Sequence, residues 1–293
     1  MDSNVNTSPR VVITGMGAVT PIGIGADEYW DALLAGQSGV DRISLFDASD
    51  YPCQIAAEVR DFPTERFFFF FRARLLARPT QFGVAAALLA LSDGNWEECP
   101  GDGRLGVGAG ISNSAQDVTE AISDTVRDHG YRRTLPYFLT KAFTHSTASE
   151  IGLITGFQDN VMTFSTACTA GFNALGYAAE EIRARRIDAF LCTSTDATIT
   201  KYAFPYFCRA GLVSFSEEPP EKVSRPFDAK RDRGVLGEGA GCLLVESLSH
   251  AQRRGARVYA ELLGFGTSGQ GYGSEPESQI PAGMVTVMND ALA

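Results

Sequence analysis

The chain has 293 residues, of which 44% are hydrophobic and 20% charged, a composition that excludes a mostly disordered protein. The 35 acidic and 25 basic residues give a formal net charge of −10. This charge argues against a general nucleic-acid binder, whose affinity depends on neutralising phosphates. We expect no membrane partner, because no apolar run reaches the roughly 18 residues of a membrane span and the N-terminus lacks the apolar core of a signal peptide. Six widely spaced cysteines predict free thiols and a cytoplasmic protein.

Apolar periodicity predicts alternating strands and helices. In chain order we expect a strand over 10–16, helices over 26–35 and 80–92, a strand over 104–111, a helix over 114–128 capped by Ser114, a strand over 161–167, a helix over 169–185, and strands over 188–195 and 241–246. This alternation predicts an α/β protein with helices on the faces of a sheet.

Two segments far apart in the sequence end in a similar way. Residues 11–17 and 258–266 both run from an apolar strand into a turn flanked by glycines. They are either two unrelated strand ends or the beginnings of a duplicated architecture whose second copy is incomplete at residue 293. The run Phe67–Phe71 is either buried, part of an interface or an irregularity of the sequence.

Cys168 is the candidate nucleophile. It follows the strand 161–167, and the segment Ser165-Thr166-Ala167-Cys168-Thr169-Ala170-Gly171 opens a helix with small residues. The N-terminus of a helix stabilises a thiolate, and its backbone N–H groups can hold an oxyanion, so this position suits acyl transfer. The alternative is a buried packing residue, as we expect for Cys192 and Cys242 within strands.

None of the three histidines has a spacing that indicates catalysis. His129 lies in a polar turn, His145 precedes the expected start of a helix, and we expect His250 to be exposed on a charged helix. No Cys or His cluster has the spacing of a metal site. Gly15 and Gly17 lack the third glycine of a dinucleotide fingerprint, since Thr20 stands in its place.

Four stretches together resemble the β-ketoacyl-acyl-carrier-protein synthases, the condensing enzymes of fatty-acid and type II polyketide synthesis. They are VVITGMGAVTPIG near the start, STACTAG around Cys168, SRPFDAKRDRGVLGEGAG over 224–241, and RRGARVYAELLGFG near the end. The resemblance implies a thiolase-like α/β fold of two layered halves, each with a mixed five-stranded sheet, the second half being incomplete. It places the first half at 1–253, with the nucleophile, and the start of the second at 254–293.

The resemblance also implies roles for individual residues. Cys168 matches the nucleophile that takes the acyl chain, which then condenses with the carbanion left when malonyl-acyl-carrier protein loses CO₂. Ile111 and Phe207 match positions near the acyl pocket. No cofactor is implied, because the substrates are carried on the phosphopantetheine of the acyl-carrier protein.

The resemblance further implies a partner and an assembly. The acidic acyl-carrier protein needs basic docking residues, for which Arg132 and Arg133 match a basic pair of relatives, while Arg72 and Arg74 lie near a second cluster. A homodimer or a ketosynthase heterodimer is expected, with the strand 161–167 near its interface.

The chain departs from the family in its length. It ends before the two histidines that stabilise the enolate in relatives, so we expect little condensation by this chain alone. We also expect a fragment whose first half leaves an apolar face uncovered and which is poorly soluble without a covering chain. The alternatives are a non-catalytic acyl-binding partner subunit, similar to a chain-length factor, and a thiolase-like relative that uses coenzyme A thioesters.

Overall fold

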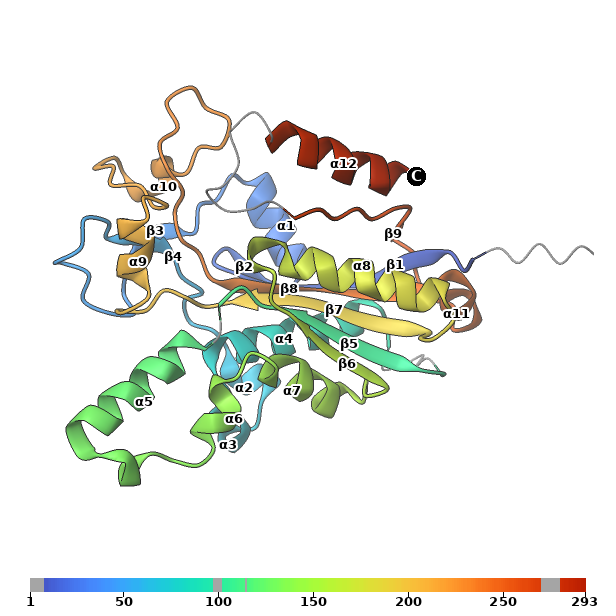
Figure 1. Ribbon diagram of the computed structural model, residues 1–293, viewed down its shortest axis with the longest axis horizontal. Helices are drawn as coiled ribbons and strands as arrows, with labels where there is room; N and C mark the ends of the chain where they lie inside the picture. Colours follow the sequence, from blue (N-terminus) through green and yellow to red (C-terminus); the bar gives the residue numbers. More distant parts are fainter. Residues whose placement is uncertain (1–7, 97–101, 114, 270–279) are drawn as a thin grey trace, which may run out of the picture.

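The computed structural model describes residues 8–96, 102–113, 115–269 and 280–293. Its centre is a mixed sheet of seven strands in the order β2-β1-β8-β7-β5-β6, with β9 paired to β1 (Figure 1). Strand β5 runs parallel to β6 and β7, whereas β1, β2, β8 and β9 join by antiparallel pairs and β8 runs antiparallel to β7. The strands are β1 Val11–Thr20, β2 Gly23–Ile24, β5 Leu105–Gly110, β6 Asn160–Phe164, β7 Ala189–Asp196, β8 Gly239–Ser247 and β9 Ala260–Glu261. A separate hairpin pairs β3 Val40–Arg42 with β4 Ile55–Ala57.

Helices cover both faces of the sheet. Helices α4 and α7 lie on one face and α8 on the other, with α1 and α12 beyond the α8 side (Figure 1). The helices are α1 Ala26–Leu34, α2 Thr64–Phe67, α3 Phe70–Ala73, α4 Arg78–Asp93, α5 Gln116–His129, α6 Phe138–Ala142, α7 Ser146–Thr155, α8 Ala170–Arg183, α9 Phe204–Arg209, α10 Pro220–Val223, α11 Leu248–Arg253 and α12 Ile280–Leu292. No helix of the described ranges combines the length and apolarity needed to cross a bilayer.

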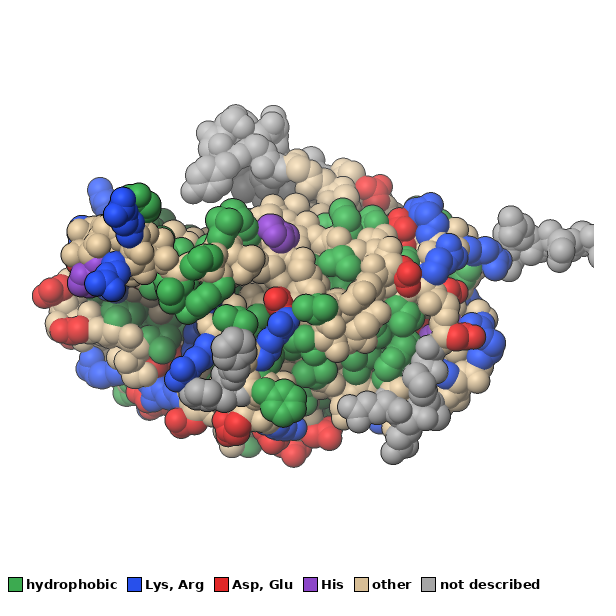
Figure 2. All heavy atoms as spheres, turned by 90° about the horizontal axis from the view of Figure 1, so that it is seen from below, with side chains coloured by type: hydrophobic (Ala, Val, Ile, Leu, Met, Phe, Trp, Pro, Cys, Tyr) green, Lys and Arg blue, Asp and Glu red, His purple; other side chains and the backbone are tan. Residues whose placement is uncertain are grey.

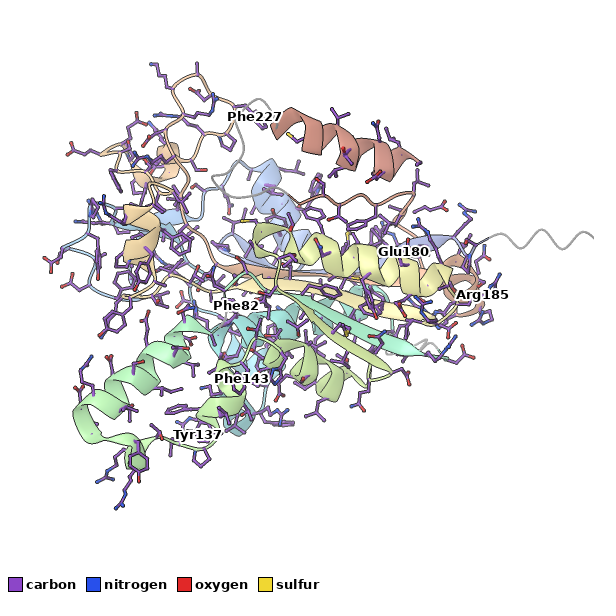
Figure 3. All side chains as sticks on the ribbon, in the orientation of Figure 1. Phe82, Tyr137, Phe143, Glu180, Arg185 and Phe227 are labelled. Carbon is purple, nitrogen blue, oxygen red and sulfur yellow. The ribbon has the colours of Figure 1, made fainter. Side chains whose placement is uncertain are left out.

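The sequence of β5 explains why α8 packs so closely on the sheet. Successive side chains of a strand point to opposite faces, so the alternation of glycine with larger residues gives β5 one flat face. A Cβ on Gly108 would come 3.2 Å from the Cβ of Ala174, and one on Gly110 would come 2.4 Å from the backbone of Ala170, both on α8. The alternate residues Val107 and Ala109 are buried in the core cluster that also contains Phe82 of α4 (Figure 3).

The expected elements are present, with shifted ends. Strand β1 continues to Thr20, and β6 stops at Phe164, so the residues before Cys168 form a turn instead of a strand. Ser114, the expected cap, lies outside the described residues, and Ala115 stands at the N-cap position of α5. Of the strand expected over 258–266, only β9 forms, and it pairs with β1 of the central sheet. The boundary between residues 253 and 254 stays a prediction.

The expectation that His250 is exposed is wrong. The ring is buried, with Nδ1 2.5 Å from Oε2 of the buried Glu246 and Nε2 2.9 Å from the carbonyl oxygen of Asp102. Arg254 donates to both oxygens of the same carboxylate at 2.9 and 2.5 Å and stacks over Trp96. The charged residues of this segment therefore form a buried network that fixes α11 against the sheet.

The phenylalanine run is divided between core and surface. Phe67 stacks on Phe62 at 5.7 Å, Phe68 is buried, and Phe69 is 92% exposed. The side chains of Phe70 and Phe71 lie outside the described part.

Large apolar side chains are exposed on the α8 side of the sheet. They include Trp30 of α1, Phe172 of α8 and Met288 of α12, as well as Phe227 near the start of α12 (Figure 3). The uncovered apolar face expected on the first half stays a prediction, because these exposed side chains lie on both sides of residue 253 in the sequence. The poor solubility expected from it stays a prediction.

Candidate active site

Cys168 lies on a sharp turn between β6 and α8. It is the second residue of the 3₁₀ turn Ala167–Thr169, which continues directly into α8. Ala167 adopts a left-handed conformation with φ of 53°, which is costly for a residue with a Cβ and is kept where the surroundings enforce it. The hydroxyl of Thr169 closes the turn by donating to the carbonyl of Thr166 at 2.8 Å. The turn projects Cys168 into solvent, where its thiol is exposed.

Cys168 forms part of the wall of a cavity of about 710 Å³ on the α8 side of the sheet. The cavity is bounded by the first two turns of α8, by α1, and by the adjoining parts of β1, β7 and β8. Its walls are mainly apolar, and their aromatic side chains are Tyr29, Trp30, Phe172 and Tyr259. Helix α8 leads away from this turn to Glu180 and Arg185 at its other end (Figure 3). An exposed thiol on an apolar cavity is accessible to a reactant with an apolar chain.

The other four described cysteines differ from Cys168 in burial. Cys53, Cys192, Cys208 and Cys242 are all buried, and none of the five described cysteines forms a disulfide. Burial raises the pKa of the Cys242 thiol to about 12 and that of Cys192 well above its ordinary value. Both also touch the cavity, but as thiols within strands, in agreement with their expected packing role.

The structure does not bring Ile111 and Phe207 into the cavity with Cys168. Ile111 follows β5 and is buried in the core cluster on the α4 side, because it continues the side-chain alternation of Val107 and Ala109. Phe207 lies on α9 and lines a different cavity of about 360 Å³ between α5 and α9. Their role at the acyl pocket stays a prediction.

The four candidate docking arginines lie on the α3, α5 and α6 side of the molecule. Arg72 forms an ion pair with Glu150 of α7, and Arg74 accepts a hydrogen bond on its carbonyl oxygen from Lys141 of α6 at 3.0 Å. Arg132 and Arg133 lie in the exposed 3₁₀ turn Tyr131–Arg133 after α5. Figure 2 views this side and shows groups of Lys and Arg side chains separated by apolar patches. No described contact of these arginines tests the docking role.

No histidine lines the cavity of Cys168. His129 and His145 are exposed, and His250 is buried with its Nδ1 in contact with the carboxylate of Glu246. Within the described ranges, no three Cys, His, Asp or Glu side chains gather in a way that could hold a metal ion. The site therefore presents a thiol without an imidazole among its described neighbours.

Sequence reasoning missed the residues that position the turn. Ser194 lines the cavity, donates from Oγ to the carbonyl of Gly110 at 3.3 Å, and lies against Gly171 of α8. Asp196 accepts hydrogen bonds from the backbone N–H groups of Ser112 and Asn113 at 2.9 and 2.8 Å. Its burial raises the pKa of the carboxyl group, although both N–H donors oppose the rise. The signal for these residues in the sequence was the alternation of glycine with larger residues before Ile111. Its meaning is clear only when β5 is seen to pair with β7, the strand that carries Ser194 and Asp196.

Comparison with known proteins places these features in a family context. The family described as "Beta-ketoacyl synthase, N-terminal domain" matches residues 8–251. The chain is similar to the 3-oxoacyl-[acyl-carrier-protein] synthase 2 of Vibrio harveyi, with 34% identity over 97% of this chain and 68% of the relative. The corresponding protein of Coxiella burnetii is 36% identical over 97% of this chain and 69% of its own length.

Solved structures show the same similarity. The ishigamide ketosynthase/chain length factor superposes with a TM-score of 0.86 at 31% identity, covering 98% of this chain and 71% of that one. A type II PKS acyl-carrier protein in complex with its ketosynthase gives a TM-score of 0.81 at 27% identity, with the same coverage of both chains.

Proposed function

Because the chain belongs to the β-ketoacyl synthase family, we propose that it is a 3-oxoacyl-acyl-carrier-protein synthase in which Cys168 receives the acyl chain. The thiolase-like α/β fold expected from the sequence is confirmed, whereas the expected five-stranded sheet has seven strands, because the two-residue strands β2 and β9 also pair with β1. The role of Cys168 is supported by its position. Its exposed thiol lies directly before α8, next to the left-handed residue Ala167, and beside an apolar cavity.

The proposed reaction has two steps. In the first, the Cys168 sulfur attacks the thioester carbonyl, a new C–S bond forms, and the carrier thiol leaves with the proton that the cysteine gives up. In the second, malonyl thioester loses CO₂, and its α-carbon attacks the acyl-enzyme carbonyl. This forms a C–C bond and breaks the acyl C–S bond, so Cys168 leaves as a thiolate and takes a proton from water to become the thiol again. The positive end of α8 favours the oxyanion of the first step.

Acyl-carrier protein is the proposed carrier, and no cofactor beyond its phosphopantetheine is needed. A neighbour that is itself in complex with an acyl-carrier protein supports this partner. We place the docking surface at Arg72, Arg74, Arg132 and Arg133, since guanidinium groups attract an acidic protein despite the net charge of −10. Arg74, Arg132 and Arg133 are exposed, whereas Arg72 is half-buried and paired with Glu150. The unpaired thiols support a reducing, cytoplasmic location.

We propose that the edge strand β6 pairs with a second chain. Strand β6 ends the sheet, and Val161 and Met162 are exposed along it. An uncovered edge with apolar side chains is a template for strand pairing. Two copies, or this chain and a related ketosynthase subunit, would then form a continuous sheet.

The test is intact-mass analysis after incubation with an acyl-acyl-carrier protein. One acyl group is expected on the wild-type chain and none on Cys168→Ala, whereas Cys53→Ala, a buried-thiol control, is expected to behave like the wild type. Acylation of Cys168→Ala at the wild-type rate would disprove the proposed nucleophile. A small acyl thioester, assayed in parallel, separates failure of docking from failure of the thiol.

The second candidate is a non-catalytic acyl-binding subunit, similar to a chain-length factor. It is favoured by the lack of a histidine in the walls of the described cavity. Decarboxylation of malonyl-acyl-carrier protein distinguishes the two functions. Decarboxylation near the background rate, together with an acylated Cys168, would leave acyl transfer as the activity of this chain. A chain that neither takes up acyl groups nor decarboxylates malonyl thioester would fit the second candidate.

A further inference from the structure

The cavity beside the end of α9 differs in charge from other cavities of the molecule. It has a volume of about 540 Å³, and its walls include Arg209 and Arg233 but no carboxylate. Four other cavities of the described part of the chain each have at least one aspartate or glutamate in their walls. In a chain of net charge −10, an anion therefore meets less repulsion in the α9 cavity than in any of those four.

The backbone brings the two arginines to one cavity. Helix α9 ends at Arg209, and Gly211 turns the chain with φ of +69°, a conformation that glycine adopts without strain. The following residues then run beside Gly234, whose N–H donates to the carbonyl of Leu212 at 3.1 Å. This pairing places the guanidinium carbon of Arg233 3.7 Å from where a Cβ of Gly211 would lie. Arg209 and Arg233 thus both line the cavity beside this turn.

The apolar walls of the cavity are held in place. The ring of Phe215 lies under the guanidinium of Arg233, 5.0 Å from its carbon. Tyr51, which also lines the cavity, donates its hydroxyl to the carbonyl of Lys201 at 3.0 Å and packs edge-on against Phe46 at 5.8 Å. Phe215 and Tyr51 therefore give the cavity aromatic surface that a flat apolar group can contact.

Neither arginine is neutralised within the described part of the chain. No carboxylate there forms an ion pair with Arg209 or Arg233, whereas the nearby Arg225 pairs with Glu218 at 2.6 Å. The neighbouring Asp232 accepts a hydrogen bond from the hydroxyl of Ser214 at 2.8 Å. A guanidinium offers a planar set of N–H donors that match two oxygens of a phosphate group.

We propose that this cavity binds a phosphate monoester with a flat apolar body. Arg209 and Arg233 would hold the phosphate oxygens, and the body would lie against Phe215 and Tyr51. The site is separate from the cavity of Cys168, and no lining residue is shared between the two. Binding is therefore expected in the Cys168→Ala chain too, which makes this proposal independent of the proposed function.

The test is calorimetric titration of the full 293-residue chain with phenyl phosphate, with inorganic phosphate, benzoate and phenol in parallel. We expect saturable binding of phenyl phosphate, weaker binding of inorganic phosphate and benzoate, and none of phenol. Arg209→Gln and Arg233→Gln are each expected to raise the Kd about tenfold, since each removes charged hydrogen bonds. Arg66→Gln is the matched control, because Arg66 also stacks on a ring, that of Phe67, outside the cavity.

Three results would overturn the proposal. The first is that phenyl phosphate shows no saturable binding up to about 50 mM. The second is that Arg66→Gln raises the Kd as much as the two cavity variants do. The third is that benzoate binds as tightly as phenyl phosphate. Both cavity arginines are exposed, so the glutamine variants are expected to fold, and their far-UV circular dichroism should match the wild type.

Discussion

Gly171 of α8 lies so close to Ser194 of β7 that a Cβ on Gly171 would come within 2.7 Å of the Ser194 Cβ. Real side chains do not approach this closely, so the first turn of α8 is in direct contact with the end of β7. This contact lies three residues after Cys168, and Ser194 lines the same cavity as the thiol. The position of the proposed nucleophile therefore depends on the absence of a side chain at residue 171.

Gly171→Ala is expected to displace the start of α8 and destabilise the fold by about 1–3 kcal/mol, the usual cost of overpacking. Acylation of Cys168 should slow as well, because its turn precedes the displaced residue. Urea unfolding gives the free energy, and the time course of intact-mass acylation gives the rate.

The double variant Gly171→Ala/Ser194→Gly is the control for this contact. Removing the Ser194 side chain makes room for the new methyl group, so the double variant should recover part of the rate and of the stability. If the double variant is as slow as Gly171→Ala, the contact does not position the turn.

Cys168 is expected to react first with iodoacetamide among the five described cysteines. The thiolate is the reactive form, and burial raises the pKa of Cys53, Cys192, Cys208 and Cys242, that of Cys242 to about 12. Peptide mass spectrometry at short times measures the order of labelling. In concentrated urea the buried thiols should become labelled too, and labelling of Cys53 or Cys208 ahead of Cys168 in the folded chain would contradict the account.

Protonation of Glu246 in acid should lower the free energy of unfolding. Burial raises the pKa of its carboxyl group, but hydrogen bonds from Arg254, His250 and Thr14 outweigh this and lower the pKa to about 2. Because the folded pKa lies below the unfolded value of about 4.5, the stabilisation is complete above pH 4.5 and is lost as the pH falls towards 2. The loss over this range is about 3 kcal/mol.

Glu246→Gln tests this network by urea unfolding across that pH range. At neutral pH it should cost about 3–5 kcal/mol, because it removes the charge of a buried carboxylate that pairs with Arg254 at 2.5 Å. Its stability should then fall less steeply between pH 4.5 and 2 than that of the wild type. Glu261→Gln, which breaks the more exposed pair with Arg10, is expected to cost at most about 1 kcal/mol. Equal losses in the two variants would argue against the buried network.

The sequence was sufficient to predict the central strands and helices and the place of Cys168 at the start of a helix, but not the turn that precedes this helix. Apolar runs and small residues report local structure, and the family motifs then identified the fold. The error at His250 has a different origin. Its neighbours in sequence are charged, and only the fold shows that Arg254 and Glu246 enclose it. Ser194 was missed because its contact with Gly171 joins a strand to a helix that precedes it in the chain.

Met162→Lys on β6 is expected to weaken self-association about tenfold or more, because a charged side chain on an edge strand opposes pairing with a second chain. Leu45→Lys is the control, since Leu45 is similarly exposed (45% against 41%) but lies away from the edge strand. Sedimentation over a range of concentrations measures the association. A monomeric wild type at all concentrations would contradict the pairing of β6 with a second copy of this chain.

Arg132→Glu and Arg133→Glu should each raise the KM for an acyl group carried on acyl-carrier protein about threefold to tenfold, with a weaker effect at high salt. The rate with a small acyl thioester should stay unchanged, because the thiol is untouched. Lys222→Glu, an equal charge change on α10, is the control. Equal effects on both substrates would mean that these arginines affect the fold instead of docking.

The central claim is that Cys168 carries the acyl group, and tryptic mapping of the acylated chain tests it most directly. Residues 142–183 form one tryptic peptide with Cys168 as its single cysteine. We predict that the acyl mass is found on this peptide, at Cys168, and is released by hydroxylamine as a thioester. An acyl group located on any other peptide, with residues 142–183 unmodified, would contradict the account.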